Sequence, residues 1–151
     1  MRGVTQSNAS RWLIGFLFIL LRMSFLGSLP SKRAAAIGWY ALIIMGSSVP
    51  GNKIPEFFLL TPDKLIHCAE YLGLGFLVMR WFAVQFTSLN ARKLVLQVLV
   101  VGAICGMADE FYQNLTPRRS PDFYDWCLDF VGVAIGIILF FLINRRSLIA
   151  R

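Results

Sequence analysis

The sequence contains few charged residues for its length. Asp, Glu, Lys and Arg together make up 15% of its 151 residues, whereas hydrophobic residues make up 57%, and the mean hydropathy is +0.64. A typical soluble domain has roughly 25% charged residues, so this composition excludes an ordinary water-soluble fold. Thirteen phenylalanines and four tryptophans suit a surface that faces lipid. The composition indicates an integral membrane protein of at most one domain of ordinary size.

Cysteine and the signatures of several common sites are also scarce. The three cysteines lie in or beside apolar segments and have no paired spacing, which argues against a disulfide framework or a zinc knuckle. The sequence has no GxSxG, no HExxH and no phosphate-binding glycine loop. The net charge of +7 is divided among short basic clusters between apolar segments. This pattern favours orientation in a membrane with anionic lipid and excludes binding to nucleic acid as the expected function.

Apolar segments follow one another along most of the chain. The first, Trp12–Leu29, contains Arg22, which costs about 2.5–3.5 kcal/mol at the centre of a spanning helix. This segment either spans the membrane with the arginine snorkelling or lies on the membrane surface, and Pro30–Arg33 is expected to end it. Four further segments are expected to span the membrane: Ala34–Ser48, Asp63 to about Phe86, Leu94–Tyr112 and about Asp122–Ile143.

We therefore predict an all-α membrane protein with a four-transmembrane-helix core bundle plus an N-terminal spanning or interfacial helix. Its expected parts are an N-terminal tail with the extra apolar helix (1–34), the transmembrane domain (35–144) and a basic cytoplasmic tail (145–151). Basic residues are usually retained in the cytoplasm, which places there three clusters: Lys32/Arg33, Arg80/Arg92/Lys93 and Arg145/Arg146/Arg151. The loops 50–62 and 114–121 then lie outside. Arg118 and Arg119 are the exception, and a basic pair on the translocated side suggests a functional role.

Polar residues are concentrated at the expected outer end of the bundle. On a helix, Asp63, His67 and Glu70 or Tyr71 share one face, and His67 is the only histidine in the chain. The alternating topology brings this face together with further polar residues of the other core helices and the loop that joins the last two: Ser47, Ser48, Asp109, Glu110, Gln113, Arg118, Arg119, Asp122, Asp125 and Asp129.

Simpler explanations exist for several of these residues individually. Asp63 and Asp122 are plausible N-caps, Lys64 is a plausible membrane anchor, and His67 alone could be a hydrogen-bonded core residue. The pair Gly132 and Gly136 is expected to form a close helix-packing face. Ionisable groups within a membrane segment are costly unless they are paired or hydrated. The joint occurrence of so many therefore indicates a functional site.

Three chemistries fit this site. The arginines with His67 can clamp an anionic lipid headgroup, or His67 with a carboxylate can act as a general acid/base pair on a lipid-linked substrate. His67 with Asp63, Asp109, Glu110 or Asp125 can also ligate a divalent cation such as Zn or Mn, although a single histidine disfavours a tight zinc site, so no metal ligand is assigned and the cofactor stays open. The candidate catalytic residues are His67, Asp63, Glu110 and Asp125. The candidate ligand-binding residues are Ser47, Ser48, Lys64, Tyr71, Asp109, Gln113, Arg118, Arg119 and Asp129.

These residues, in this order, resemble the VanZ-like family of small bacterial membrane proteins. The resemblance covers roughly residues 36–143. It consists of the serine pair Ser47–Ser48, the stretch DKLIHCAEYLGLGFL with Asp63, Lys64, His67, Tyr71 and Leu74, the run Asp109–Glu110–Phe111–Tyr112–Gln113, the turn Pro117–Arg118–Arg119, Asp125 six residues later, and Gly132 and Gly136. This chain differs in having Asp129 where the family usually has asparagine, and Trp12–Leu29 has no clear counterpart.

The resemblance implies a four-helix core in the bacterial cytoplasmic membrane and a link to teicoplanin resistance, with no declared reaction. We expect an enzyme that acts on a lipid or cell-envelope precursor at the outer face of that membrane. The alternative is a non-catalytic protein that binds an envelope lipid or antibiotic. Permeation is less expected, because the charges gather at one end instead of lining a path. The expected partner is a membrane lipid or lipid-linked precursor, and the oligomeric state is not predicted.

Overall fold

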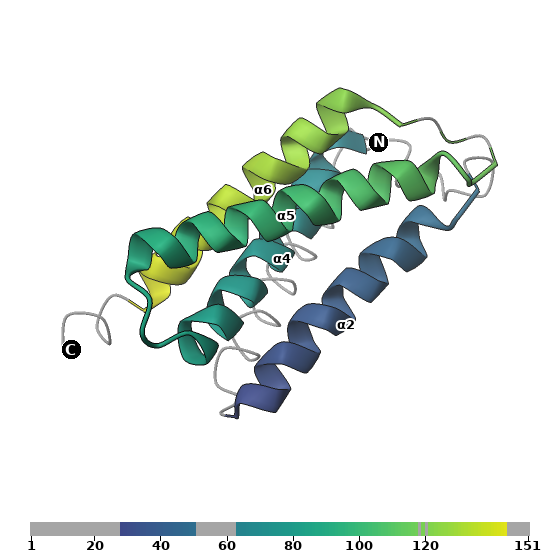
Figure 1. The fold of residues 1–151 in the computed structure, drawn as a ribbon. Coiled ribbons are helices and arrows are strands. Elements are labelled where there is room, and N and C mark those ends of the chain that lie inside the picture. The colour runs from purple at the N-terminus through teal and green to yellow at the C-terminus, as the bar shows by residue number, and fades with distance from the viewer. Residues whose placement is uncertain (1–27, 51–62, 118, 120, 145–151) are drawn as a thin grey trace, which may run out of the picture.

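Four helices make up the part of the protein that the structure, a computed structural model, describes: residues 28–50, 63–117, 119 and 121–144. They are α2 (Leu29–Ser47), α4 (Asp63–Gln85), α5 (Ala91–Gln113) and α6 (Phe123–Ile143), and these residues contain no strand. The helices run alternately up and down, so that the ends of α2 and α5 meet the beginnings of α4 and α6 (Figure 1). The predicted helical bundle is confirmed. The expected N-terminal helix, apart from its last two residues, and the tail 145–151 lie outside the described residues.

The first described helix, α2, begins earlier than expected. It starts at Leu29 instead of Ala34, with Pro30 in its first turn. Proline suits this position, because its fixed φ is helical and the missing N–H has no intrahelical acceptor there in any case. The sequence Pro30–Arg33, expected to end the preceding segment, is thus part of α2.

Side-chain caps mark where α5 and α6 begin. Asn90 Oδ1 accepts a hydrogen bond from the backbone N–H of Lys93 at 3.0 Å, and Asp122 Oδ1 accepts one from the N–H of Tyr124 at 2.8 Å. Such bonds satisfy amides that have no partner within the helix. The prediction that Asp122 is an N-cap is confirmed. The corresponding prediction for Asp63 concerns a side chain outside the described part.

Two of the described helices, α5 and α6, are long and apolar enough to cross a membrane. The other two are long enough, at 19 residues for α2 and 23 for α4, but they are too polar to meet the same criterion. The first turns of α2 contain Ser31, Lys32 and Arg33, and α4 contains Glu70 and Arg80 besides its polar beginning. Four spanning helices were expected, but only α5 and α6 have the composition of a membrane-spanning helix.

The helix α4 lies at the centre of the bundle. It contacts α2, α5 and α6, most extensively α6, and it supplies much of the buried core, including Tyr71, Phe76, Leu77 and Met79. Its contact with α6 brings the two backbones together at two glycines. A Cβ at Gly132 would overlap the carbonyl oxygen of Cys68, and one at Gly136 would overlap that of Leu72. The predicted packing role of Gly132 and Gly136 is confirmed.

Aromatic side chains of α2 attach it to its neighbours by hydrogen bonds. Trp39 Nε1 donates to the carbonyl oxygen of Glu70 in α4 at 2.8 Å, and the Tyr40 hydroxyl donates to that of Cys105 in α5 at 3.1 Å. A buried donor left without an acceptor would cost about 1–3 kcal/mol. These two bonds therefore fix how α2 lies against α4 and α5.

Candidate functional site

Buried polar side chains from all four described helices gather at the end of the bundle where α2 and α5 end and α4 and α6 begin. We call this region the polar end. It contains Ser47 of α2, His67 of α4, Asp109, Glu110 and Gln113 of α5, and Asp125 and Asp129 of α6. The structure thus brings together predicted site residues that are up to 82 positions apart in the sequence, Ser47 and Asp129.

The pair at the centre of the polar end is His67 and Asp129. His67 Nδ1 lies 3.3 Å from Asp129 Oδ1, and the two side chains are only 5% and 1% exposed. Although these atoms are close, they lack the geometry of a hydrogen bond, and neither has such a bond within the described part of the chain. The pair forms an ion pair when the imidazole is protonated. Gly132, one turn after Asp129, allows this close approach of α6 to α4.

Glu110 brings a third donor atom to the same place. One ligand atom each from His67, Glu110 and Asp129 can be chosen so that all three atoms lie within 4.8 Å of one another. The Oε2 atom of Glu110 accepts a hydrogen bond from the backbone N–H of Asp122 at 2.8 Å. Its other oxygen, Oε1, has no hydrogen bond to any described residue. The amide of Asp122 therefore holds the Glu110 carboxylate beside His67 and Asp129, with one of its oxygens left unpaired among the described residues.

Asp109 and Tyr71 lie beside this cluster and are fully buried. Gln113 Nε2 donates to Asp109 Oδ2 at 3.3 Å, and Ser47 lies next to the same carboxyl group. Asp109 Oδ1 and the Tyr71 hydroxyl have no hydrogen bond among the residues that the structure describes. The polar end thus keeps unused hydrogen-bonding capacity in a buried place, which a ligand can take up.

The rim of the polar end is closed by hydrogen bonds between α2 and the end of α5. The Ser48 hydroxyl donates to the carbonyl oxygen of Ile44 at 2.7 Å, so that the Tyr112 hydroxyl, 3.0 Å away, donates to Ser48. Thr116 Oγ1 donates to the carbonyl oxygen of Ser47 at 3.2 Å. Ser48 therefore has a structural function at this rim. Thr116 was not singled out in the sequence, where nothing distinguishes it from other loop residues.

Of the predicted arginine pair, Arg119 is described and Arg118 lies outside the described residues. Arg119 is half-buried, its backbone N–H donates to the carbonyl oxygen of Thr116 at 3.1 Å, and its charge acts on Glu70 and Asp109. The side chains of Asp63 and Lys64 also lie outside the described part. Their predicted roles, like those of all the candidate residues, stay predictions.

In the sequence analysis Asp129 is only a ligand-binding candidate, whereas the carboxylates grouped with His67 as catalytic candidates are Asp63, Glu110 and Asp125. Among the described residues it is Asp129 that contacts the imidazole. A signal for this partner was present in the sequence, because Asp129, Gly132 and Gly136 lie on one face of α6. A face that carries small residues is the one that a neighbouring helix approaches most closely.

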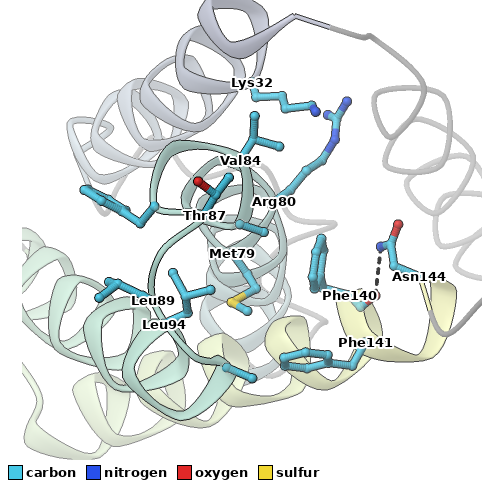
Figure 2. A pocket seen from close by; sticks show the side chains of 13 residues that line it. Lys32, Met79, Arg80, Val84, Thr87, Leu89, Leu94, Phe140, Phe141 and Asn144 are labelled. Carbon is cyan, nitrogen blue, oxygen red and sulfur yellow. Dashed lines mark hydrogen bonds between the residues drawn. The ribbon is translucent and has the colours of Figure 1, made fainter. Parts of the chain in front are cut away.

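The opposite end of the bundle has a different character. A cavity of about 290 Å³ lies there between α2, the end of α4, the beginning of α5 and the end of α6 (Figure 2). Lys32 and Arg80 extend toward each other at its edge (Figure 2), and none of the described residues that line it is acidic. The two ends of the bundle thus differ in sign of charge, as the positive-inside distribution of the sequence suggests.

Comparison with known proteins agrees with this arrangement. The family model described as VanZ/LLP1 matches residues 10–144 of the chain. The chain belongs to the VanZ/LLP1 family. The resemblance to VanZ-like proteins is thereby confirmed, and the VanZ/LLP1 match also includes Trp12–Leu29, for which no family counterpart was expected.

One curated relative is an uncharacterised protein of Saccharomyces cerevisiae, YJR112W-A. It is 28% identical to this chain over 109 residues, which are 69% of this chain and 100% of the yeast protein. No solved structure matches the chain at a significant level. These comparisons establish the VanZ/LLP1 family and carry no information on a reaction.

Proposed function

We propose that this VanZ/LLP1 protein is a membrane-embedded enzyme that acts on the polar group of a lipid or lipid-linked cell-envelope precursor. The observation that carries the proposal is the contact of His67 Nδ1 with Asp129 Oδ1 at 3.3 Å. An imidazole beside a carboxylate is a common arrangement for general acid–base catalysis. Both groups are buried in a bundle that is otherwise largely apolar, where ionisable side chains are costly unless they serve a function.

In the proposed arrangement all four described helices cross the bacterial cytoplasmic membrane. α5 and α6 have the required length and composition. Within α4, the side chains of His67 and Arg80 are buried, so that neither places a charge on the lipid-facing surface. Phe111, Phe123 and Tyr124, each 68–70% exposed near the polar end, suit the boundary between lipid and water, where aromatic residues are enriched.

The distribution of basic residues supports an outward-facing polar end. Lys32 and Arg80 lie at the opposite end of the bundle, and lysine and arginine are retained preferentially on the cytoplasmic side. A lipid headgroup in the outer leaflet can then reach the polar end from the side of the loop 114–121. This orientation excludes cytoplasmic metabolites as the proposed substrates.

Four residues of the polar end and the neighbouring arginines have proposed roles. His67 transfers a proton to or from the substrate, and Asp129 orients the imidazole and stabilises its protonated form. Glu110 and Asp125 supply further carboxyl groups for proton transfer. Arg119, with Arg118 beside it in the sequence, binds an anionic group such as a lipid phosphate, because guanidinium groups form strong charge-assisted bonds with phosphate.

The test measures lipid turnover by the full-length protein in vesicles of phosphatidylglycerol and a polyprenyl phosphate, with the lipids resolved by mass spectrometry. The wild-type protein should convert a lipid component, and His67→Ala should slow the conversion by at least about 100-fold, the usual contribution of general acid–base catalysis. Ser88→Ala is the control. Ser88 is exposed in the turn between α4 and α5 at the opposite end of the bundle, so its replacement should keep the wild-type rate.

Two outcomes contradict catalysis. A wild-type rate in His67→Ala rejects the assignment of this residue outright. Vesicles in which no lipid is converted, together with lipid or glycopeptide binding that His67→Ala weakens, favour the alternative of a non-catalytic protein that recognises an envelope lipid or antibiotic.

A further inference from the structure

We infer that the polar end binds one divalent transition-metal ion through His67, Glu110 and Asp129. The inference rests on the proposed function in that it takes the polar end as the reacting site. It adds a ligand that neither the family match nor the yeast relative assigns. The three residues come from three helices, α4, α5 and α6, so the site exists only in the folded bundle.

The distance between two of the donor atoms fits a single ion, and the third donor lies close to them. His67 Nδ1 and Asp129 Oδ1 are 3.3 Å apart, and a set of three donor atoms that includes one from Glu110 lies within 4.8 Å. Two donors bound to zinc at ordinary distances of roughly 2.1 Å and a tetrahedral angle are separated by about 3.4 Å. The spacing between the imidazole and the carboxylate is thus that of two ligands of one ion.

The unused hydrogen-bonding capacity of the same atoms is the second observation. Asp129, His67 and Glu110 are 1%, 4% and 7% exposed. Both carboxylate oxygens of Asp129, Nδ1 of His67 and Oε1 of Glu110 have no hydrogen bond to any residue that the structure describes. Buried polar atoms are nearly always paired. A cation bound among these atoms would interact favourably with all of them at once. A proton on one of them would form a hydrogen bond to only one other atom.

The charge balance at the polar end points the same way. Four buried acidic side chains gather there, Asp109, Glu110, Asp125 and Asp129, and they exceed the positive groups described at this end, which are the imidazole of His67 and the half-buried Arg119. Like charges in a medium of low dielectric constant repel strongly, and isolated buried carboxylates are costly. A divalent cation offsets two of these negative charges where they are closest.

The donor types indicate which class of ion is bound. One imidazole nitrogen with carboxylate oxygens suits zinc or manganese, whereas magnesium and calcium prefer oxygen ligands alone. The backbone amide of Asp122 holds the second oxygen of Glu110 at 2.8 Å, and such outer contacts commonly orient metal ligands. With an ion bound, the imidazole of His67 would hold the metal, and the proton transfer proposed for His67 would pass to a water molecule whose pKa the ion lowers.

The test measures the metal content of the full-length protein, purified in detergent through a tag that contains no histidine and without chelators. Elemental mass spectrometry should find about one zinc or manganese ion per chain, and His67→Ala, Glu110→Gln and Asp129→Asn should each lose most of it. Loss of an outer contact already weakens metal binding by about 10–100-fold, so loss of a ligand should weaken it by at least about 100-fold. Ser88→Ala, an exposed position in the turn between α4 and α5 at the opposite end of the bundle, is the control that should retain the ion.

A second measurement guards against variants that fail to fold. After removal of metal with EDTA, addition of ZnCl₂ or MnCl₂ should raise the melting temperature of the wild-type protein, because a ligand that binds only the folded state stabilises it. MgCl₂ should have a smaller effect, and the melting temperature of Asp129→Asn should not respond. Size-exclusion profiles and helical circular dichroism identify variants that remain folded.

Metal-free wild-type protein whose melting temperature does not respond to zinc or manganese would overturn the inference. Equal metal content in wild type and Asp129→Asn would also overturn it, since the ion would then lie elsewhere. These results differ from a failure of the proposed function. If a metal-free protein converts lipid and the conversion depends on His67, only the inference of a metal site is contradicted. If the protein contains one ion per chain but converts no lipid, only the proposed enzymatic function is contradicted.

Discussion

Gly136→Ala tests the contact on which the polar end depends, the close approach of α4 and α6. The added Cβ would overlap the carbonyl oxygen of Leu72 and lie 2.7 Å from the backbone nitrogen of Phe76. Both are backbone atoms within a helix, which cannot rotate away as a side chain can. The substitution therefore forces α6 to move outward from α4.

The expected magnitude is the difference of two effects. Overpacking of this kind costs about 1–3 kcal/mol, and the upper half of that range applies because the clash involves backbone. Alanine regains about 1 kcal/mol relative to glycine within a helix. We expect a net loss of about 1–2 kcal/mol, which should lower the melting temperature by roughly 3–6 °C for a chain of this size.

The assay is thermal unfolding of the detergent-purified protein, with Gly38→Ala as the matched control. Gly38 lies within α2, and a Cβ there would meet no atom within 4 Å, so that alanine should stabilise the protein by about 0.5–1 kcal/mol. The two glycine-to-alanine changes should therefore have opposite signs. If Gly136→Ala raised the melting temperature as much as Gly38→Ala, the close backbone contact and the site geometry that depends on it would be refuted.

Two further predictions concern the position of α2 and the orientation of the bundle. Trp39→Phe removes the hydrogen bond to the carbonyl oxygen of Glu70 and should cost about 1–2 kcal/mol in the free energy of unfolding; an unchanged melting temperature would show that this bond does not hold α2 in place. In a background whose native cysteines are replaced by alanine, Arg118→Cys should react with a membrane-impermeant maleimide from outside the cell. Labelling only in inverted vesicles would reverse the proposed orientation.

Much of the fold was predictable from local patterns. Helix α4 was expected from Asp63 to about Phe86 and extends from Asp63 to Gln85, and the cap at Asp122 was expected from its place before an apolar segment. Periodicity and caps act over one helix, so the sequence carries this information directly. The beginning of α2 was misplaced, because Pro30 was interpreted as an end although proline is equally common in a first turn.

The gathering of polar residues at one end was also predictable. Short connections make successive helices antiparallel, so that each helix ends beside the beginning of the next one. The polar ends of helices that are far apart in the sequence therefore meet at the same end of the bundle. The order of the helices is sufficient for this prediction. In the structure, buried polar residues from Ser47 to Asp129 gather at one end of the bundle.

What the order of helices leaves open is which side chains touch, and only the tertiary structure decided this. From the sequence, several carboxylates lie at plausible positions near His67, and Asp129 was assigned to ligand binding and not to catalysis. A helical pattern fixes which residues share a face but not how that face is rotated toward a neighbour. That rotation is set here by backbone contact at Gly132 and Gly136, which turns the Asp129 side of α6 toward His67.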